Sequence, residues 1–442
     1  MLRRSFLPIL LVCFVAALVS VSPVAPANRE ARADVPGQGE QVPLYDQWTS
    51  TTQVYRNIDG TFTTVMGAGP IQARDPASAT GWSPIDTTLQ PTANGLSPDQ
   101  ADAAITFSSG EDAAPLATVA QDGTSLSVGL DGDVPAPSVS GDTATYPDVQ
   151  PGVDATLQAT PSGFEESFLV DSVDHAPESL AVPLDLDRLT PSLTPGDALV
   201  LTDATGHVVG GADPAMMWGA ATDPATGEPT VVALVPTSLV ATADGFILEL
   251  TPDPAFFTDP TLTWPVTIDP AVNLTIQVDA YVDSSQPTTS FGSSLTIRSG
   301  KANSGALYRG FIGFGTGPIN GTYVVSASLS LWETWAASCT PTQVDVYSVS
   351  SSVTPPFTWN NKPAEGALYS SGSSAQGCNG NPGNLTLAQA GPGGPPSPTW
   401  FRPGPTEPLS PPRWNSAPMT KPTSQRARNS VPPRAPHLRS CR

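Results

Sequence analysis

Four aromatic residues between positions 330 and 360 could bind a sugar: Trp332, Trp335, Tyr347 and Trp359. A flat ring exposed on a rigid sheet offers a surface for the C–H face of a sugar, and polar groups beside it fix the orientation. Nearby basic residues that could contact an acidic sugar are Arg298, Lys301, Arg309 and Lys362. Packing is the alternative for each ring: Trp332 and Tyr347 as a cross-strand pair, Trp359 as a core residue and Trp335 as a loop anchor.

Residues for catalysis or metal binding are present but not in a spacing that supports either. No Gly-x-Ser-x-Gly, His-Glu-x-x-His or phosphate-loop motif accompanies the three histidines. The pair Glu165 and Glu166 could hydrolyse a glycoside, but they are two of 33 acidic residues in one segment and mean little by themselves. The sequence has no zinc-type cluster and no Asp-x-Asp-x-Asp-Gly loop. We therefore expect no enzyme and no cofactor, with calcium an unsupported alternative.

Alternating strands are expected to position the aromatic residues. The stretch 276–283 predicts one inward and one outward face, with Ile276, Val278, Ala280 and Val282 inward and Asp279, Tyr281 and Asp283 outward. Residues 327–332 and 344–347 alternate as cleanly. If these two strands form a hairpin with Leu331 opposite Ser348, Trp332 and Tyr347 share its exposed face.

Residues 34–270 favour many short strands. Asp59 and Gly60 lie between two strand-like stretches and predict a hairpin, because Asp-Gly supplies the positive φ of a tight turn. Strand spacing near ten residues with frequent Gly and Pro favours antiparallel sheets, and we expect an all-β chain. The acidic side chains are expected mostly in turns and on outer faces, where they keep the protein soluble.

Charge divides the 442-residue chain into segments. Residues 34–270 hold three basic and 33 acidic residues, and residues 271–390 hold four and five. Residues 391–442 hold eight basic residues, one acidic residue and 14 prolines. The formal net charge of −21 argues against nucleic acid as a partner, because phosphate binding needs clustered cations.

The two ends have their own composition. A signal peptide over 1–33 is predicted by Arg3, Arg4 and the apolar run 6–21. We therefore expect export to the outside of the cell or its wall, with no membrane contact after cleavage. An uncleaved membrane anchor is the minority alternative. At about Gln389 the composition changes to the Pro, Arg and Ser bias of a wrong reading frame. Either 391–442 is a frameshifted or truncated end, or it is a true disordered tail. In both cases we expect the preceding sandwich to lack its last strands.

Cysteine usage agrees with export. Cys13 lies in the signal and Cys441 in the tail, which leaves Cys339 and Cys378 within 271–390. The sequence predicts a disulfide between these two, with two unpaired thiols as the alternative.

Six ordered blocks in 271–390 carry a resemblance to a known family. They are Asp-Ala-Tyr-Val-Asp-Ser (279–284), Ser-Phe-Gly-Ser-Ser (290–294), Tyr-Arg-Gly-Phe-Ile-Gly-Phe (308–314), Ser-Ala-Ser-Leu-Ser-Leu (326–331), Val-Asp-Val-Tyr (344–347) and Thr-Trp-Asn-Asn-Lys-Pro (358–363). The segment resembles the DNRLRE-type module, also classed as carbohydrate-binding module family 96, although the hexapeptide of that name is absent. The resemblance implies an antiparallel, jelly-roll-like β-sandwich.

The acidic segment also resembles a known region, the one that precedes such modules in large secreted actinobacterial proteins, including wall-associated ones with Rhs-type repeats. The blocks are 54–60, 81–86, 146–154, 217–218 and 264–270. We therefore expect a secreted, non-enzymatic protein whose sandwich binds a polysaccharide or cell-wall glycan, an acidic one first because of its basic residues. The alternative is the N-terminal export and scaffold portion of a larger wall-associated or toxin-delivering protein.

Overall fold

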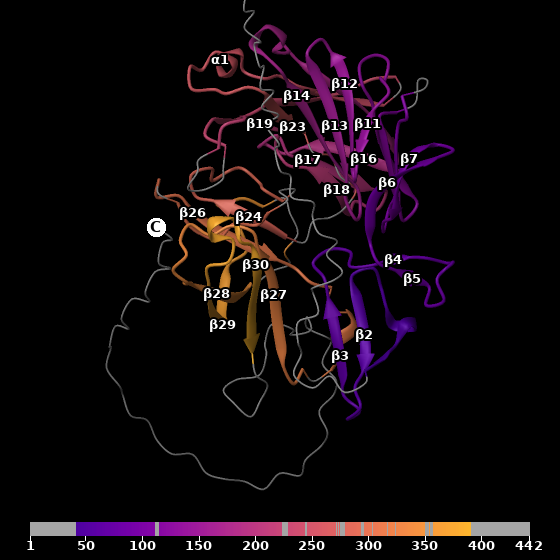
Figure 1. The fold of residues 1–442 in the computed structure, drawn as a ribbon, viewed down its shortest axis with the longest axis vertical. Helices are drawn as coiled ribbons and strands as arrows, with labels where there is room; N and C mark the ends of the chain where they lie inside the picture. Colours follow the sequence, from indigo (N-terminus) through magenta and orange to yellow (C-terminus); the bar gives the residue numbers. More distant parts are fainter. Residues whose placement is uncertain are drawn as a thin grey trace, which may run out of the picture.

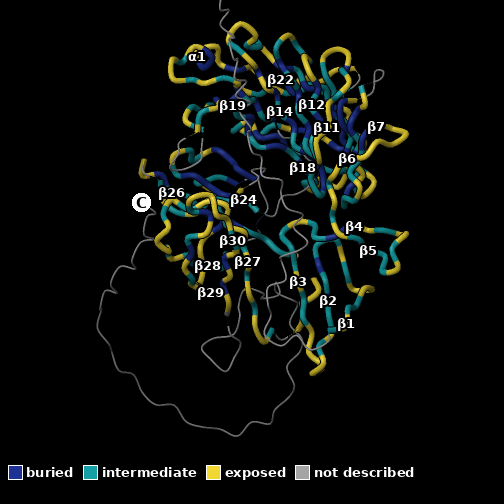
Figure 2. The backbone as a smooth tube through the Cα atoms, viewed as in Figure 1, coloured by how far each residue is buried: buried dark blue, intermediate teal, exposed yellow. Residues whose placement is uncertain are grey.

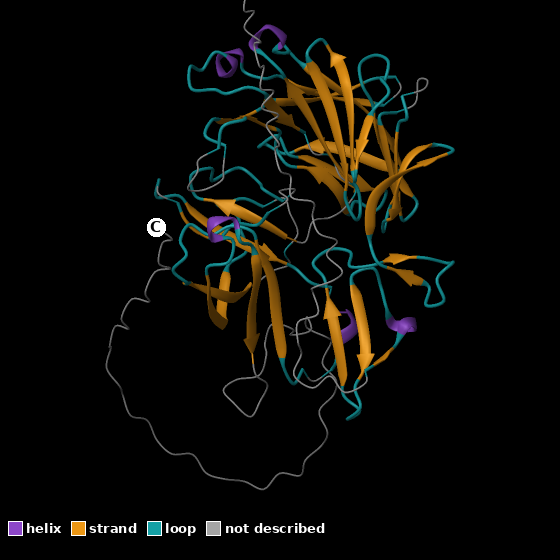
Figure 3. Cartoon of the chain, in the orientation of Figure 1, coloured by secondary structure: helices purple, strands orange, loops and turns teal. Residues whose placement is uncertain are grey.

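The structure is a computed structural model that describes residues 41–389, apart from residues 111–114, 223–228, 244, 271, 273, 275–278, 293–295, 303, 316, 323, 350–352 and 354–356. The predicted signal peptide and tail lie outside the described residues. Strands form nearly all regular structure (Figure 1, Figure 3). The helical elements described are α1 (Pro254–Phe257) and the 3-10 turns η1 (Tyr45–Gln47), η2 (Val173–His175), η3 (Gly317–Ile319) and η4 (Cys378–Gly380). The all-β prediction is confirmed.

Two small sheets begin the described chain. Their strands are β1 (Val42–Pro43), β2 (Thr52–Arg56) and β3 (Phe62–Met66) in one sheet and β4 (Ala73–Arg74) with β5 (Trp82–Ser83) in the other. The predicted hairpin is confirmed: β2 and β3 pair with Val54 opposite Thr64, and Gly60 in their turn has a φ of 85°.

Two large antiparallel sheets follow. In spatial order the eight-stranded sheet holds β21 (Thr237–Ala241), β22 (Phe246–Leu250), β15 (Leu180–Asp187), β10 (Thr124–Val128), β9 (Ala117–Gln121), β8 (Ala104–Phe107), β7 (Gly95–Gln100) and β6 (Asp86–Thr92). The seven-stranded sheet holds β11 (Ser138–Ser140), β12 (Thr143–Gln150), β13 (Val153–Ala159), β14 (Phe164–Val170), β23 (Val266–Asp269), β19 (Met216–Gly219) and β20 (Val232–Leu234). A third sheet holds β16 (Leu189–Leu193), β17 (Leu199–Asp203) and β18 (Val208–Ala212).

One continuous hydrophobic core joins these three sheets. Every second residue of β13 is buried, as alternation in a half-buried strand requires. Phe107 of β8 meets Phe164 of β14 edge to face, with 5.9 Å between ring centres, so the two large sheets share this core. Figure 2 shows the buried backbone concentrated in this part of the chain. The outer strand β6 contains Pro91, and the outer strand β11 is only three residues long.

The prediction that acidic side chains face outward has an exception. Glu166 of β14 is fully buried on the core face of its strand, between Phe164 and Phe168 in the alternation. Within the described residues neither of its carboxyl oxygens has a hydrogen-bond partner. Burial, together with the charge of Asp269, raises the pKa of Glu166 to about 8.

The C-terminal strands form three further small sheets. They are β24 (Asp279–Asp283), β26 (Leu307–Ile312) and β25 (Gly300–Lys301) in the first, β27 (Ala327–Glu333) with β30 (Gly383–Gln389) in the second, and β28 (Thr342–Val349) with β29 (Glu365–Ser374) in the third. A separate, smaller core lies among them, made of Ala280, Val282, Phe311, Val353 and Phe357. Two strands, β29 and β30, therefore follow the 358–363 block.

Two predictions about these strands are wrong. Residues 327–332 do not pair with 344–347: β27 pairs with β30 and β28 with β29, because an alternating strand can pair with a distant partner as well as with the next one. Tyr281 and Asp283 are buried rather than outward. Phe291 stacks on Tyr281 with 4.5 Å between ring centres, and Asp283 Oδ1 accepts hydrogen bonds from the main chain and hydroxyl of Ser285, at 2.7 Å each.

Candidate functional site

The outward residues of β27 and β30 form a polar surface around one exposed ring. We call this surface the Trp332 face; it consists of Ser328, Ser330, Trp332, Asn384 and Thr386. Trp332 is 54% exposed and pairs with Asn384, while Ser330 pairs with Thr386. Alternation turns the leucines of both strands to the other side, where Leu385 and Leu387 are buried.

The sheet of β28 and β29 supports the Trp332 face from behind. Ser370 of β29 donates a hydrogen bond from Oγ to the carbonyl of Ala388 at 3.0 Å, and Ser374 donates one to Glu333. A Cβ at Gly372 would collide with the side chain of Leu387, so the two sheets approach as closely as glycine permits. The two layers leave the Trp332 face outward on a backed sheet.

A second group of the predicted residues lies around Trp359. Lys362 Nζ lies 4.0 Å from the centre of the Trp359 ring and donates a hydrogen bond to the carbonyl of Trp359 at 2.8 Å. Arg309 Nε lies 3.0 Å from Glu365 Oε1. Burial, with the charge of Arg309, lowers the pKa of Lys362. Trp359 itself is half-buried and packs against the smaller core, so part of its ring serves packing.

Tyr347 is half-buried on β28 and borders the same charges. Its pKa is raised by burial first and then by the carboxylates of Asp345 and Glu365. It does not share a face with Trp332, because the two rings belong to different sheets.

The remaining predicted cations lie on, or beside, the sheet of β24, β25 and β26. The guanidinium of Arg298 lies 5.0 Å from the ring centre of the buried Tyr281. Lys301 is exposed at the end of β25. The predicted residues therefore do not form one site: Trp332 lies on β27, in a different sheet from Lys301 on β25 and Arg309 on β26.

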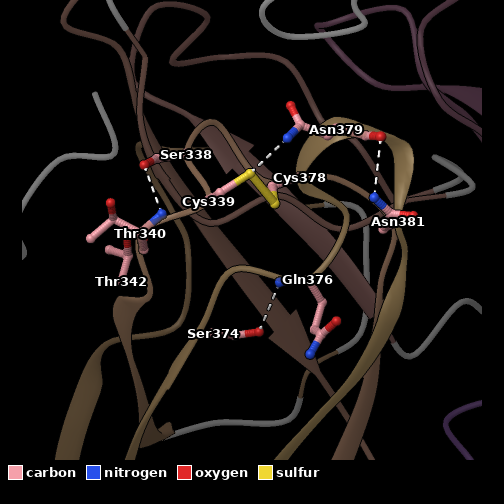
Figure 4. Close-up of a disulfide and its surroundings, with 9 residues drawn as sticks. All are labelled: Ser338, Cys339, Thr340, Thr342, Ser374, Gln376, Cys378, Asn379 and Asn381. Atoms are coloured by element: carbon pink, nitrogen blue, oxygen red, sulfur yellow. Dashed lines mark hydrogen bonds between the residues drawn. A yellow bond between two sulfur atoms is a disulfide. The ribbon is translucent and has the colours of Figure 1, made fainter.

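The predicted disulfide between Cys339 and Cys378 is confirmed, with 5.2 Å between the two Cα atoms (Figure 4). Gly377, beside it, has a φ of 78°, and a Cβ there would collide with the main chain of Thr334 and Trp335. The turn that carries Cys378 thus lies against the segment that carries Trp335, whose side chain is 42% exposed.

Sequence reasoning missed the hydroxyl and amide residues of the Trp332 face. Asn384 and Thr386 come from β30, and the signal was available in the alternation of residues 383–388. That stretch lies beyond the blocks of the family resemblance, so the resemblance predicts no strand there.

Other chemistry is limited in the described part of the chain. There, no group of three or more His, Cys, Asp or Glu side chains could hold a metal ion. His175 Nδ1 lies 2.7 Å from Asp171 Oδ1 in an exposed pair, and the hydrogen bond to Asp171 raises the pKa of His175. Among the described residues no helix has the length and apolar composition to span a membrane.

In comparison with known proteins, residues 270–377 match the model of carbohydrate-binding module family 96, a class of carbohydrate-binding modules. The chain is also 28% identical over 149 residues to the tRNA(Glu)-specific nuclease WapA of Bacillus subtilis subsp. natto, and 30% identical over 152 residues to the tRNA nuclease WapA of Bacillus subtilis strain 168. Each alignment covers 34% of this chain and 6% of the relative. No solved structure matches the chain.

Proposed function

We propose that this protein is a secreted, non-enzymatic carbohydrate-binding protein that attaches to a cell-wall or extracellular glycan through residues 271–390, here called the C-terminal module. The observation that carries the proposal is the exposed ring of Trp332, which lies inside the matched residues 270–377. It is fixed on a backed strand and surrounded by hydroxyl and amide groups, the arrangement that sugar stacking requires. Export rests on the signal-like sequence of residues 1–33 and on the disulfide, which persists in oxidising compartments.

The first prediction concerns the ring itself. We expect Trp332→Ala to cost about 1 to 3 kcal/mol of glycan affinity, by analogy with the stacking of nucleic-acid bases on aromatic side chains. The unfolding midpoint should stay nearly unchanged, because more than half of the side chain is already in water. Affinity electrophoresis and calorimetry against a panel of polysaccharides measure the first effect, and thermal unfolding measures the second.

A matched control is Leu368→Ala. Leu368 is 53% exposed on β29, so the variant removes a similarly exposed apolar side chain from the other sheet. Its glycan affinity should equal that of the parent. Equal losses in both variants, or a collapse of the fold in Trp332→Ala, would assign Trp332 to packing instead.

A second candidate function is supported by the partial alignments. The chain spans about 6% of the length of its curated relatives, which are large tRNA nucleases. The alternative proposal is that it is the export and scaffold portion of a larger wall-associated or Rhs-type toxin-delivering protein. Sequencing the gene across codons 380–400 and translating the following DNA in all frames tests this. Continuation into repeats in another frame would favour the scaffold function, and its absence would leave the glycan-binding proposal alone.

A further inference from the structure

The charges of the module are distributed away from the Trp332 face. None of the described outward residues of β27 and β30 is charged: they are the five residues of the Trp332 face and, beside them, Ala388. An acidic sugar carries a carboxylate or sulfate that needs a cation or several N–H donors to replace its water. The Trp332 face offers no cation for that purpose.

Three of the four basic residues of the module already have partners. Arg309 is paired with Glu365, Lys362 lies over Trp359, and Arg298 lies over Tyr281. Lys301 is exposed, but it lies on β25, in a different sheet from β27 and β30. The chain as a whole has a formal charge of −21, which repels a polyanion at low ionic strength.

The polar groups of the Trp332 face suit a neutral ligand. Each hydroxyl can donate one hydrogen bond and accept others, and the amide of Asn384 does both, as sugar hydroxyls do. The side chains of Ser328, Ser330, Asn384 and Thr386 make no hydrogen bond to another described residue. Ser328 and Trp332 lie four residues apart on one strand, about 13 Å, which accommodates more than one sugar ring.

We propose, resting on the glycan-binding function above, that the Trp332 face binds an uncharged glycan chain lying across β27 and β30, and that the basic residues of the module do not bind ligand. The ring of Trp332 stacks on one sugar, while Asn384, Ser330 and Thr386 contact the hydroxyl groups beside it. This replaces the acidic glycan that the amino-acid composition favoured.

The test compares neutral and acidic probes on the full exported chain. The neutral probes are β-glucan and xylan oligosaccharides, the acidic ones are alginate and polygalacturonate oligosaccharides, and each is titrated by calorimetry at low and at high salt. We expect binding to a neutral probe with little salt dependence. Trp332→Ala should weaken it about 5- to 160-fold. Asn384→Asp, which keeps the shape but removes the amide donor, should weaken it about two- to tenfold.

Lys301→Ala is the matched control and should leave neutral binding unchanged. Binding confined to the acidic probes, reduced by salt and by Lys301→Ala but not by Asn384→Asp, would overturn the neutral-glycan inference and leave the proposed function standing. Absence of binding to all four probes by the folded chain would overturn the proposed function itself. Asn384→Asp keeps the test decisive should Trp332→Ala fail to fold, because Asn384 is exposed.

Discussion

Glu166→Gln is expected to stabilise the three sheets that share the large core above neutral pH. It should also remove most of the decline in their free energy of unfolding between pH 4.5 and 8. Glu166 is fully buried beside the phenylalanines of β14, and its carboxyl oxygens have no hydrogen-bond partner among the described residues. Burial therefore favours the protonated acid, and the nearby charge of Asp269 adds to the effect.

The direction of the effect follows from proton binding. In the unfolded chain the carboxyl has its ordinary pKa of 4.5, whereas in the folded protein its pKa is about 8. Between these values the folded state holds a proton that the unfolded state has lost, so the free energy of unfolding falls as pH rises, by about 1.4 kcal/mol per pH unit. The contribution is fully present below pH 4.5 and is lost above about pH 8. Glutamine cannot ionise, so this decline is absent from the variant.

Urea unfolding of parent and variant, at steps from acid to mildly alkaline pH, measures the difference. Other titrating groups are common to both proteins and largely cancel in the comparison. Glu165→Gln is the control, because Glu165 lies on the opposite, half-exposed face of β14, and it should keep the pH dependence of the parent. A pH slope in Glu166→Gln equal to that of the parent would show that the carboxyl is ionised in the folded protein.

Removal of the disulfide is expected to cost the C-terminal module about 4 kcal/mol, a large loss for a part of the protein with a small core. Cys339 and Cys378 are 39 residues apart, and the estimate is the chain entropy that closing such a loop removes from the unfolded state. Among the described residues, the core cluster of the module has five buried members, whereas the preceding sheets share a much larger cluster.

Scanning calorimetry of Cys339→Ser/Cys378→Ser should show the transition of the module lowered or lost and that of the large sheets retained. Adding a reductant to the parent should reproduce this result, and the same reductant should not affect the double variant. A module transition at the parental temperature in both experiments would mean that the bridge adds nothing to stability.

Local sequence patterns predicted local structure correctly. The wrong predictions concern contacts between residues that are far apart in the sequence. Asp59-Gly60 predicted the hairpin of β2 and β3 because a tight turn brings neighbouring strands together. Alternation correctly placed Ser328, Ser330 and Trp332 on one outward face, but it carries no information about which strand pairs with which. The partner of β27 begins 50 residues after β27 ends, so the pairing with β28 could not be excluded from sequence.

The alternation of polar and apolar residues also failed to predict which polar residues are buried. Tyr281 alternates as an outward residue, yet it is buried, with Phe291 stacked on its ring and Arg298 close to it. Glu166 follows Glu165 in a strongly acidic segment, and only the pairing of β14 with β13 and β23 shows that one of the two faces the core. Of the aromatic residues proposed for sugar contact, sequence could not distinguish the exposed Trp332 from the half-buried Trp359.

The outer strands of the large sheets have a consequence for the behaviour of the protein at high concentration. A free sheet edge can recruit a strand from another molecule and so begin aggregation. Pro91 lacks the N–H that an incoming strand would need, and prolines in sheets lie at such edges with that position toward solvent. At one edge of the other large sheet, the three residues of β11 offer too short a ladder for stable pairing. These two edges thus resist strand exchange between molecules, a property that would suit the exported protein proposed above, because cytoplasmic chaperones do not act outside the cell.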